Sequence, residues 1–241
     1  MNDPGTKDPR TIELATNLAR VREELAEAAV KAGREPSSVT LVAVTKTWPA
    51  ADVRRLAELG VADVGENRDQ EAAPKASACR DVDVRWHFIG QLQTNKVRSV
   101  ATYADVVHAV DRVRLVGALD RAAVSAGRRL RVLLQVSLAL APAPDGGRGG
   151  AAPSELSALA DAVLASAALD LGGVMGVAPL GDDPAAAFAR LADASEDLRT
   201  AHPGATWVSA GMSADFVQAI EHGATHVRIG SALLGNRSPL R

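Results

Sequence analysis

The stretch Val39-Thr-Leu-Val-Ala-Val-Thr45 decides the fold class, and Lys46 follows it directly. Its apolar and β-branched residues run without a polar alternation, which is typical of a strand covered on both faces. A helical pattern follows over residues 49–59. Because parallel sheets are built from strands that alternate with helices, this unit predicts an α/β protein.

The same unit recurs along the chain. Further short apolar runs cover residues 62–64, 85–89, 106–110, 131–137, 171–177, 206–209 and 226–229, and helical patterns include residues 112–126, 153–167 and 184–201. Eight such units in 241 residues predict a single closed (β/α)8 barrel of the TIM type. An open doubly wound sheet is the alternative, but no G-x-G-x-x-G motif follows the first strand.

The N-terminal region predicts an extra helix. Asp8 and Pro9 form a helix-start signal, with an acidic N-cap and proline at the first helical position. One helical face then carries Leu14, Leu18, Val21 and Leu25. We expect this face to pack on the core, a dimer seam being the alternative. We expect residues 1–9 to form a disordered tail, residues 10–241 a single barrel, and the protein to be a monomer.

Composition excludes several classes of protein. Hydrophobic residues make up 47% and charged residues 23%, which suits an ordinary folded domain. Aromatic residues are only 3%, so we expect Ala, Val and Leu to fill the core. With 29 acids and 27 bases there is no basic footprint for nucleic acid or for a membrane surface. We see no signal peptide or membrane span, so we expect a cytoplasmic protein. The single Cys79 is expected to be an inert thiol.

The least regular segment is Ala139–Ala152, which contains Pro142, Pro144 and four glycines within residues 146–150. It lacks the Lys-Ser/Thr ending of a P-loop. We expect a mobile surface loop, with a lid over the barrel mouth as the alternative.

Lys46 is the first candidate functional residue. Lys7, Lys31, Lys75 and Lys96 lie in polar or helical surroundings, whereas Lys46 ends an apolar strand. Strand C-termini point at the active-site mouth of such barrels. Burial would lower the lysine pKa and favour the neutral amine that attacks aldehydes. The alternative is a lysine that extends to the solvent at the rim.

The last quarter of the chain predicts a phosphate site. Ser209-Ala-Gly-Met-Ser213 follows the seventh strand and Gly230-Ser231 follows the eighth. Phosphates often sit at these two loops in barrels. Glycines such as Gly211 let the backbone approach a ligand, and the serines supply donors where a helix begins. Ser213 could also be a simple N-cap.

Arg228 lies within the eighth strand. Facing inward, it would place a guanidinium near a bound ligand, although pairing with a core carboxylate is the alternative. Of the five histidines, only His222 and His226 have helical spacing, and Gly223 breaks it. We therefore expect no metal site and place the histidines at the surface or rim.

At this point the sequence resembles the pyridoxal phosphate homeostasis protein family, the stand-alone relatives of the alanine racemase N-terminal barrel. The matching segments run in the family's order: Leu41–Lys46, Val64–Glu71, Trp86–Lys96, Gly211–Ser213 with Asp215, and Val227–Ser231 followed by Gly235–Arg237. The His87–Lys96 block is the most specific. Its role stays open between covering the barrel mouth and contacting a partner.

The resemblance implies pyridoxal 5′-phosphate (PLP) held as a Schiff base on Lys46. It implies Asn67 near the ring, Arg228 beside the pyridine nitrogen and Met212 on the pocket wall. Ser213, Gly230 and Ser231 would hold the phosphate, and we include Ser209 and Gly211 in the cofactor-binding set.

Function is expected to be cofactor holding rather than turnover. An arginine beside the pyridine nitrogen disfavours its protonation and makes the ring a weaker electron sink. The resemblance also implies no second tyrosine base from an added domain, since Tyr103 is the only tyrosine. We expect a protein of vitamin B6 homeostasis that delivers the cofactor to apo forms of PLP enzymes. The alternatives are a weak amino-acid racemase or lyase, and a barrel enzyme that binds a sugar phosphate.

Overall fold

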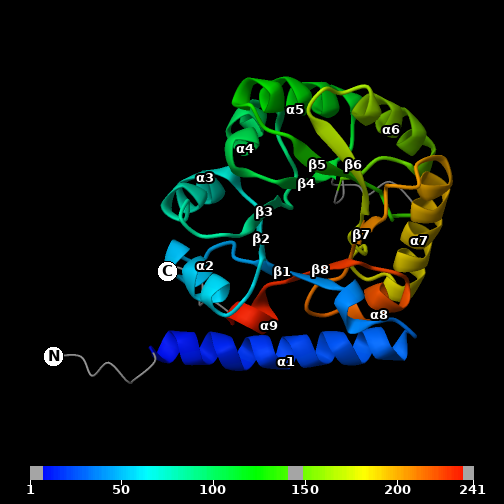
Figure 1. The fold of residues 1–241 in the computed structure, drawn as a ribbon. Helices are drawn as coiled ribbons and strands as arrows, with labels where there is room; N and C mark the ends of the chain where they lie inside the picture. Colours follow the sequence, from blue (N-terminus) through cyan, green and yellow to red (C-terminus); the bar gives the residue numbers. More distant parts are fainter. Residues whose placement is uncertain (1–7, 141–148, 236–241) are drawn as a thin grey trace.

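The computed structural model describes residues 8–140 and 149–235 (Figure 1). Its strands form one closed parallel barrel in sequence order, and β1 pairs with β8 to close it. The strands are β1 Thr40–Val44, β2 Asp63–Glu66, β3 Arg85–Phe88, β4 Val106–Val110, β5 Leu130–Gln135, β6 Leu169–Met175, β7 Trp207–Ser209 and β8 His226–Ile229. The predicted (β/α)8 barrel is confirmed, and the open-sheet alternative is wrong.

Helices surround the barrel (Figure 1). They are α1 Pro9–Lys31, α2 Ala50–Glu58, α3 Asp69–Ala78, α4 Val97–Tyr103, α5 Val113–Ala126, α6 Leu156–Leu164, α7 Pro184–Ala201, α8 Phe216–Glu221 and α9 Ser231–Leu234. Among the described residues, short 3-10 turns are η1 Pro36–Ser38, η2 Thr94–Lys96 and η3 Pro153–Glu155. The helix expected over residues 153–167 is therefore divided, with η3 leading into a shorter α6.

The extra helix α1 begins at Pro9, and the Asp8 side chain accepts a hydrogen bond from the Arg10 N–H, as the cap signal predicts. Residues 1–7 of the expected tail lie outside the described residues. The apolar face of α1 is buried within the chain itself, where the helix lies against α8 and α9. The dimer-seam alternative is therefore wrong for this face.

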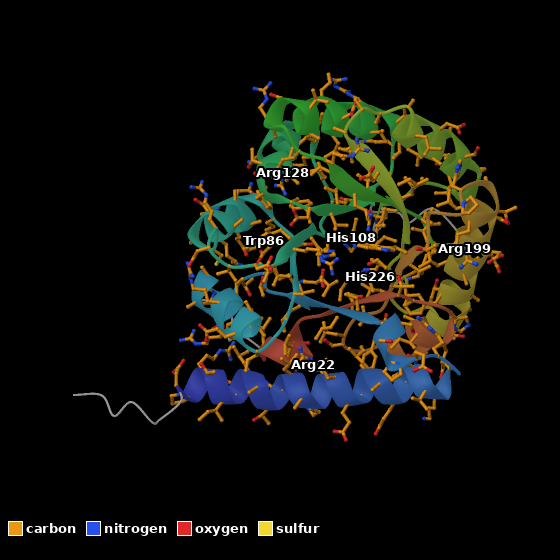
Figure 2. The ribbon with its side chains drawn as sticks, viewed as in Figure 1. Arg22, Trp86, His108, Arg128, Arg199 and His226 are labelled. Carbon is orange, nitrogen blue, oxygen red and sulfur yellow. The ribbon has the colours of Figure 1, made fainter. Side chains whose placement is uncertain are left out.

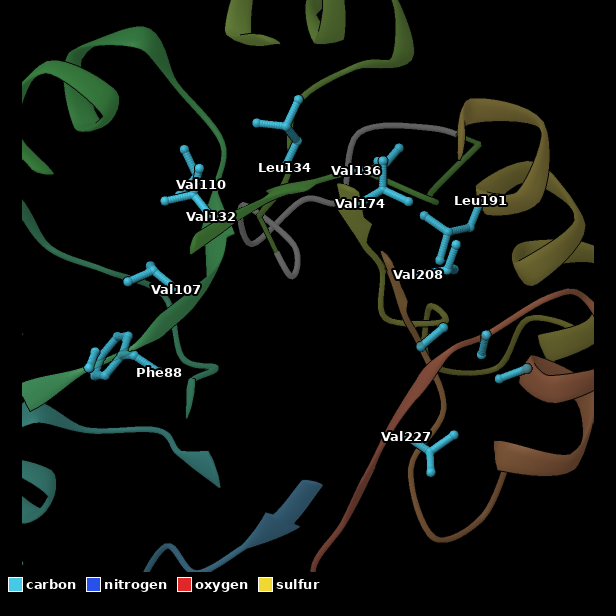
Figure 3. Packing of buried hydrophobic residues seen from close by; sticks show 14 of the residues in the cluster. Phe88, Val107, Val110, Val132, Leu134, Val136, Val174, Leu191, Val208 and Val227 are labelled. Atoms are coloured by element: carbon cyan, nitrogen blue, oxygen red, sulfur yellow. The ribbon is translucent and has the colours of Figure 1, made fainter. Parts of the chain in front are cut away.

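The main apolar core lies between the outer face of the strands and the helices. Figure 3 shows part of it, with side chains of several strands and Leu191 of α7. Val, Leu and Ala dominate this cluster, as the low aromatic content predicts.

The inside of the barrel differs from the outer core. A small apolar cluster contains Val106, Ala109, Leu133 and Met175. Branched apolar side chains usually fill such an interior. Here it also holds buried polar side chains: Asp63, His87, His108, Ser209, His226 and Arg228. His108 and His226 are seen near the middle of the ring of strands in Figure 2.

Within residues 8–140 and 149–235, no helix is long and apolar enough to cross a membrane. Most of the expected loop over residues 139–152, including Pro142, Pro144 and residues 146–148, lies outside the described residues. Ala151 forms an isolated parallel bridge with Val136.

Candidate functional site

Lys46 lies in a turn directly after β1, at the C-terminal end of the barrel. Val42 and Val44 of β1 both lie beside Gly65 of β2, inside the barrel, and the strand ends two residues before Lys46. The side chain of Lys46 is exposed, which agrees with the alternative of a lysine that extends to the solvent at the rim. The Lys46 side chain therefore lies at the barrel mouth, where the turn exposes it to solvent.

Helix α3 holds the backbone on both sides of Lys46. The Lys75 ammonium donates to the Thr45 carbonyl oxygen at 2.7 Å. The Glu71 carboxylate accepts from the Thr47 N–H at 2.9 Å. Thr47 has a φ of 68°, in the left-handed region that β-branched residues rarely adopt. These two contacts secure a strained turn, and they fix the starting point of the Lys46 side chain.

Lys75 is buried, which corrects its assignment to polar, solvated surroundings. Its ammonium pairs with Glu66, which also accepts from the Thr45 hydroxyl at 2.6 Å. Burial raises the pKa of Glu66 despite these partners. Both hydrogen bonds reach Oε1, and the buried Oε2 has no partner.

The loops after β7 and β8 come together as predicted. The Ser231 hydroxyl donates to the Ser213 hydroxyl oxygen at 3.3 Å. Gly211 has a φ of 85°, and a Cβ there would lie 2.8 Å from the Cα of Phe216. Gly230 lies close to β1, since a Cβ there would lie 3.5 Å from the Val44 oxygen. Ser231 therefore follows β8, the neighbour of β1, and Lys46 follows β1.

Met212 and Ser213 occupy the loop before α8. Met212 is 37% exposed, and its N–H donates to the Asp215 carboxylate at 2.6 Å. The helix begins at Phe216 with Asp215 at the N-cap position, so the interpretation of Ser213 as its cap is wrong. This frees the Ser213 hydroxyl to face Ser231.

Arg228 is buried inside the barrel. Its Nη1 donates to the Ser209 hydroxyl oxygen at 2.6 Å and its Nη2 to the Gly176 carbonyl oxygen at 2.9 Å. Within the described residues it forms no ion pair, so the alternative of a core carboxylate partner is wrong. Burial lowers the pKa of Arg228 to about 10, which still leaves a cation at neutral pH.

Asn67 lies at the mouth, after β2, and is exposed. A Cβ on Gly90 would lie 2.0 Å from the Asn67 carbonyl oxygen, so only glycine allows this approach. A cavity of about 570 Å³ lies here, lined by residues 67–71, Phe88, residues 91–93 and Lys96. The His87–Lys96 block thus lines the mouth beside Asn67.

The histidines are the main correction. His87, His108 and His226 are buried rather than at the surface or rim. His87 and His108 bond to each other, to Asp63 at one end and to Ser209 at the other. Sequence reasoning missed this group. A polar side chain inside the run Val106-Val-His-Ala-Val110 is the signal that could have found it.

The fold and these loops define the class of the protein, a barrel of the alanine racemase type. The family model described as "Alanine racemase, N-terminal domain" matches residues 16–238. An alanine racemase of Clostridium difficile has a TM-score of 0.71 at 13% identity, covering 93% of this chain and 60% of its own, which shows the fold alone.

Within that class the chain belongs to the pyridoxal phosphate homeostasis protein family. The protein of that name from Mycobacterium tuberculosis is 42% identical over 247 residues, covering 95% of this chain and 94% of its own length. PipY of Synechococcus elongatus, solved with PLP bound, has a TM-score of 0.79 at 35% identity, covering 92% of this chain and all of its own.

Proposed function

We propose that this protein binds PLP as a Schiff base on Lys46 and takes part in intracellular vitamin B6 homeostasis by holding and delivering the cofactor. The observation that carries the proposal is the position of the Lys46 turn on β1 beside the Gly230-Ser231 loop on β8. Residues Ala43 and Ile229 are paired in register, which brings these two strand ends together. The names of the relatives and the PLP-bound PipY structure support the same ligand.

The donor set fits PLP. The hydroxyls of Ser213 and Ser231 lie 3.3 Å apart, and each has a hydrogen that it can donate to a phosphate oxygen. Arg228 offers only donors, which suits a pyridine nitrogen that carries no proton. Asn67 lies on a further loop of the same mouth, and Met212 lies next to Ser213 in the loop before α8. When bound, PLP supplies an aldehyde for a lysine amine and an electron-withdrawing ring.

The residues of this chain then have distinct roles. Lys46 is the nucleophile, and α3 holds the peptides on both sides of it. The two serines bind the phosphate, and Gly211 and Gly230 keep the backbone close. Ser209 orients Arg228, which stays charged and therefore cannot give the ring nitrogen the full proton that strong carbanion chemistry needs. These roles favour holding the cofactor over turning over a substrate.

Borohydride reduction followed by peptide mapping tests the attachment. We expect the reduced pyridoxyl group on the peptide that contains Lys46, and its loss in Lys46→Ala. Lys96→Ala is the matched control and should retain the label. A label on another lysine, or none after incubation with PLP, would reject the proposal.

Delivery is a separate claim with a separate test. Loaded protein is mixed with an apo-enzyme in the presence of a phosphatase that destroys free PLP. Reactivation faster than from free PLP at the same concentration supports delivery. Reactivation at the free-ligand rate rejects delivery and leaves the holding role intact. A panel of amino acids assayed for racemisation or cleavage, with Lys46→Ala as control, tests the enzymatic alternative.

We further propose that the protein acts as a monomer in the cytoplasm. The apolar face of α1 is already covered by its own barrel, which supports this. Light scattering should give a mass near 25.0 kDa, and a value twice as large would reject the monomer.

A further inference from the structure

A chain of buried side chains crosses the barrel interior from β2 to β8. The Asp63 carboxylate lies 2.8 Å from His87 Nε2, and His87 Nδ1 lies 2.8 Å from His108 Nε2. His108 Nδ1 lies 2.9 Å from the Ser209 hydroxyl, which accepts from Arg228 at 2.6 Å. Each of the five is at most 4% exposed. We call this group the interior chain.

The Asp63 end of the interior chain is anionic. Burial alone would raise the pKa of Asp63, but hydrogen bonds from His87 and Arg85 lower it below its usual value. Arg85 makes two contacts with this carboxylate, at 2.8 and 2.9 Å. Asp63 therefore accepts at both oxygens, and His87 Nε2 must carry a hydrogen.

The direction of the remaining hydrogen bonds follows step by step. Burial lowers the pKa of His108 well below its usual value, so this ring is neutral. Because the Ser209 hydroxyl already accepts from Arg228, its own hydrogen is free to donate to His108 Nδ1, so His108 Nε2 donates and His87 Nδ1 accepts. A hydrogen on His87 Nδ1 would reverse both bonds and leave the hydroxyl hydrogen of Ser209 without a partner in the interior chain.

Each N–H and O–H in the interior chain thus points from Arg228 toward Asp63. Hydrogen bonds aligned in one direction polarise one another, and a low-dielectric interior strengthens the effect. The alignment favours a positive charge at Arg228 and a negative charge at Asp63. Within the described residues, no group of three or more acidic, histidine or cysteine side chains is arranged to hold a metal ion.

We propose that Asp63, His87, His108 and Ser209 act as a positioning relay that fixes the orientation and charge of the Arg228 guanidinium from the opposite end of the barrel. The relay holds Nη1, while the Gly176 carbonyl holds Nη2. The Nε–H and one hydrogen on each Nη remain for a ligand. That Arg228 faces the pyridine ring of PLP rests on the proposed function. The direction of the hydrogen bonds in the relay does not depend on it.

The direction of the hydrogen bonds in the interior chain is tested on the protein without PLP. Nitrogen-15 NMR of the histidine rings reports which nitrogen carries the hydrogen. We expect the Nε2–H form for both His87 and His108 near pH 8. A hydrogen on Nδ1 of either ring would overturn the relay. This result does not depend on PLP binding, so it separates failure of the relay from failure of the proposed function.

A remote variant distinguishes a relay from simple packing. Asp63→Asn keeps the shape, but its NH2 group must face a donor of Arg85 or of His87. The chain then loses its fixed direction, and we expect His108, which Asp63 does not contact, to show a mixture of both forms. An unchanged His108 signal would reject the relay. His226→Gln is the matched control, since His226 is buried nearby but bonds to Thr225.

The loaded protein gives a third readout. We expect His108→Leu to weaken PLP binding roughly tenfold and to change the absorption band of the bound cofactor, because Arg228 loses its fixed orientation. His108→Gln, which can both accept and donate, should recover much of the affinity, and His226→Gln should match the parent. Equal affinity and spectra in His108→Leu and the parent would overturn the positioning role.

Discussion

Replacing Lys75 by methionine tests the helix that holds the Lys46 turn. The change keeps a long, unbranched side chain and removes only the ammonium. Glu66 loses its ion-pair partner, and the Thr45 carbonyl oxygen loses its donor. Lys75 is 7% and Glu66 1% exposed, so water cannot replace either contact without opening α3.

The expected loss is large for one substitution. Removing one partner of a buried ion pair costs about 3–5 kcal/mol because the other charge stays buried and unpaired. In a chain of this length, each kcal/mol lowers the melting temperature by roughly 2–4 °C. We therefore expect Lys75→Met to melt roughly 6–20 °C below the parent. Lys31→Met, at an exposed position, should change stability by less than about 0.5 kcal/mol.

Thermal and urea unfolding followed by circular dichroism measure the effect at pH 8 and pH 5. The pKa of Glu66 is raised in the folded state, so its contribution to stability is present below its ordinary value of 4.5 and is lost as pH rises through the folded value. Lys75 lowers the pKa of Glu66, so without Lys75 that pKa rises further and stability depends more strongly on pH. Lys75→Met should therefore be less destabilised, relative to the parent, at pH 5.

A double variant completes the test. Lys75→Met with Glu66→Met replaces the pair by apolar side chains, which is often neutral for stability. It should recover most of the loss. If Lys75→Met lies within about 1 kcal/mol of the parent at pH 8, or if the double variant is no better, the ion pair does not hold this helix as described.

Three further predictions concern stability. Burial lowers the pKa of His226 to about 3, so this residue destabilises the fold as pH falls from 6.5 toward 3. We expect His226→Gln to flatten this part of the curve of unfolding free energy against pH. An unchanged slope would contradict the prediction. Leu14→Ala should lower the free energy of unfolding in urea by about 2–5 kcal/mol, because this side chain of α1 is fully buried. Ile12→Ala should lower it little, because Ile12 is half-exposed. Gly90→Ala should cost about 1–3 kcal/mol of stability through overpacking, because a Cβ there meets the Asn67 backbone. Gly117→Ala in α5 should stabilise the protein slightly. Equal melting temperatures for the two variants would refute the close approach at Gly90.

The fold could be predicted because its signals are local. Each buried strand is a short apolar run, and alternation with helices leaves few architectures. The helix α3 is less visible because it contains Pro74 and has no apolar residue larger than alanine apart from that proline. The division of the segment after residue 152 into η3 and α6 depends on how its first turn packs, which periodicity does not report.

The candidate site could be predicted only in part. Loop position after β7 and β8 brought Ser213 and Ser231 into consideration, and the structure places them together. The exposure of Lys46 could not be foreseen, since it depends on a left-handed turn at Thr47. The burial of Lys75 depends on its ion pair with Glu66 on β2, and the sequence pattern does not report this pair.

The interior chain was missed for a different reason. His87 and His108 are far apart in sequence, and neither has metal-ligand spacing. Their shared direction into the barrel follows from strand alternation and from the pairing of β3 with β4. Counting alternation along β2, β3 and β4 would have pointed Asp63, His87 and His108 into the barrel interior, where all three are buried.

The contact of α1 with α9 connects the N-terminal helix to the loop that follows β8. Arg10, Asn17 and Arg20 of α1 donate to the carbonyl oxygens of Leu234, Leu233 and Ala232, at 3.1, 3.0 and 2.9 Å. The same short helix begins at Ser231. By thermodynamic reciprocity, a ligand that favours the ordered α9 strengthens the docking of α1 by the same free energy that docked α1 adds to ligand affinity. We therefore expect occupancy at the barrel mouth to be readable as slower amide hydrogen exchange in the N-terminal helix.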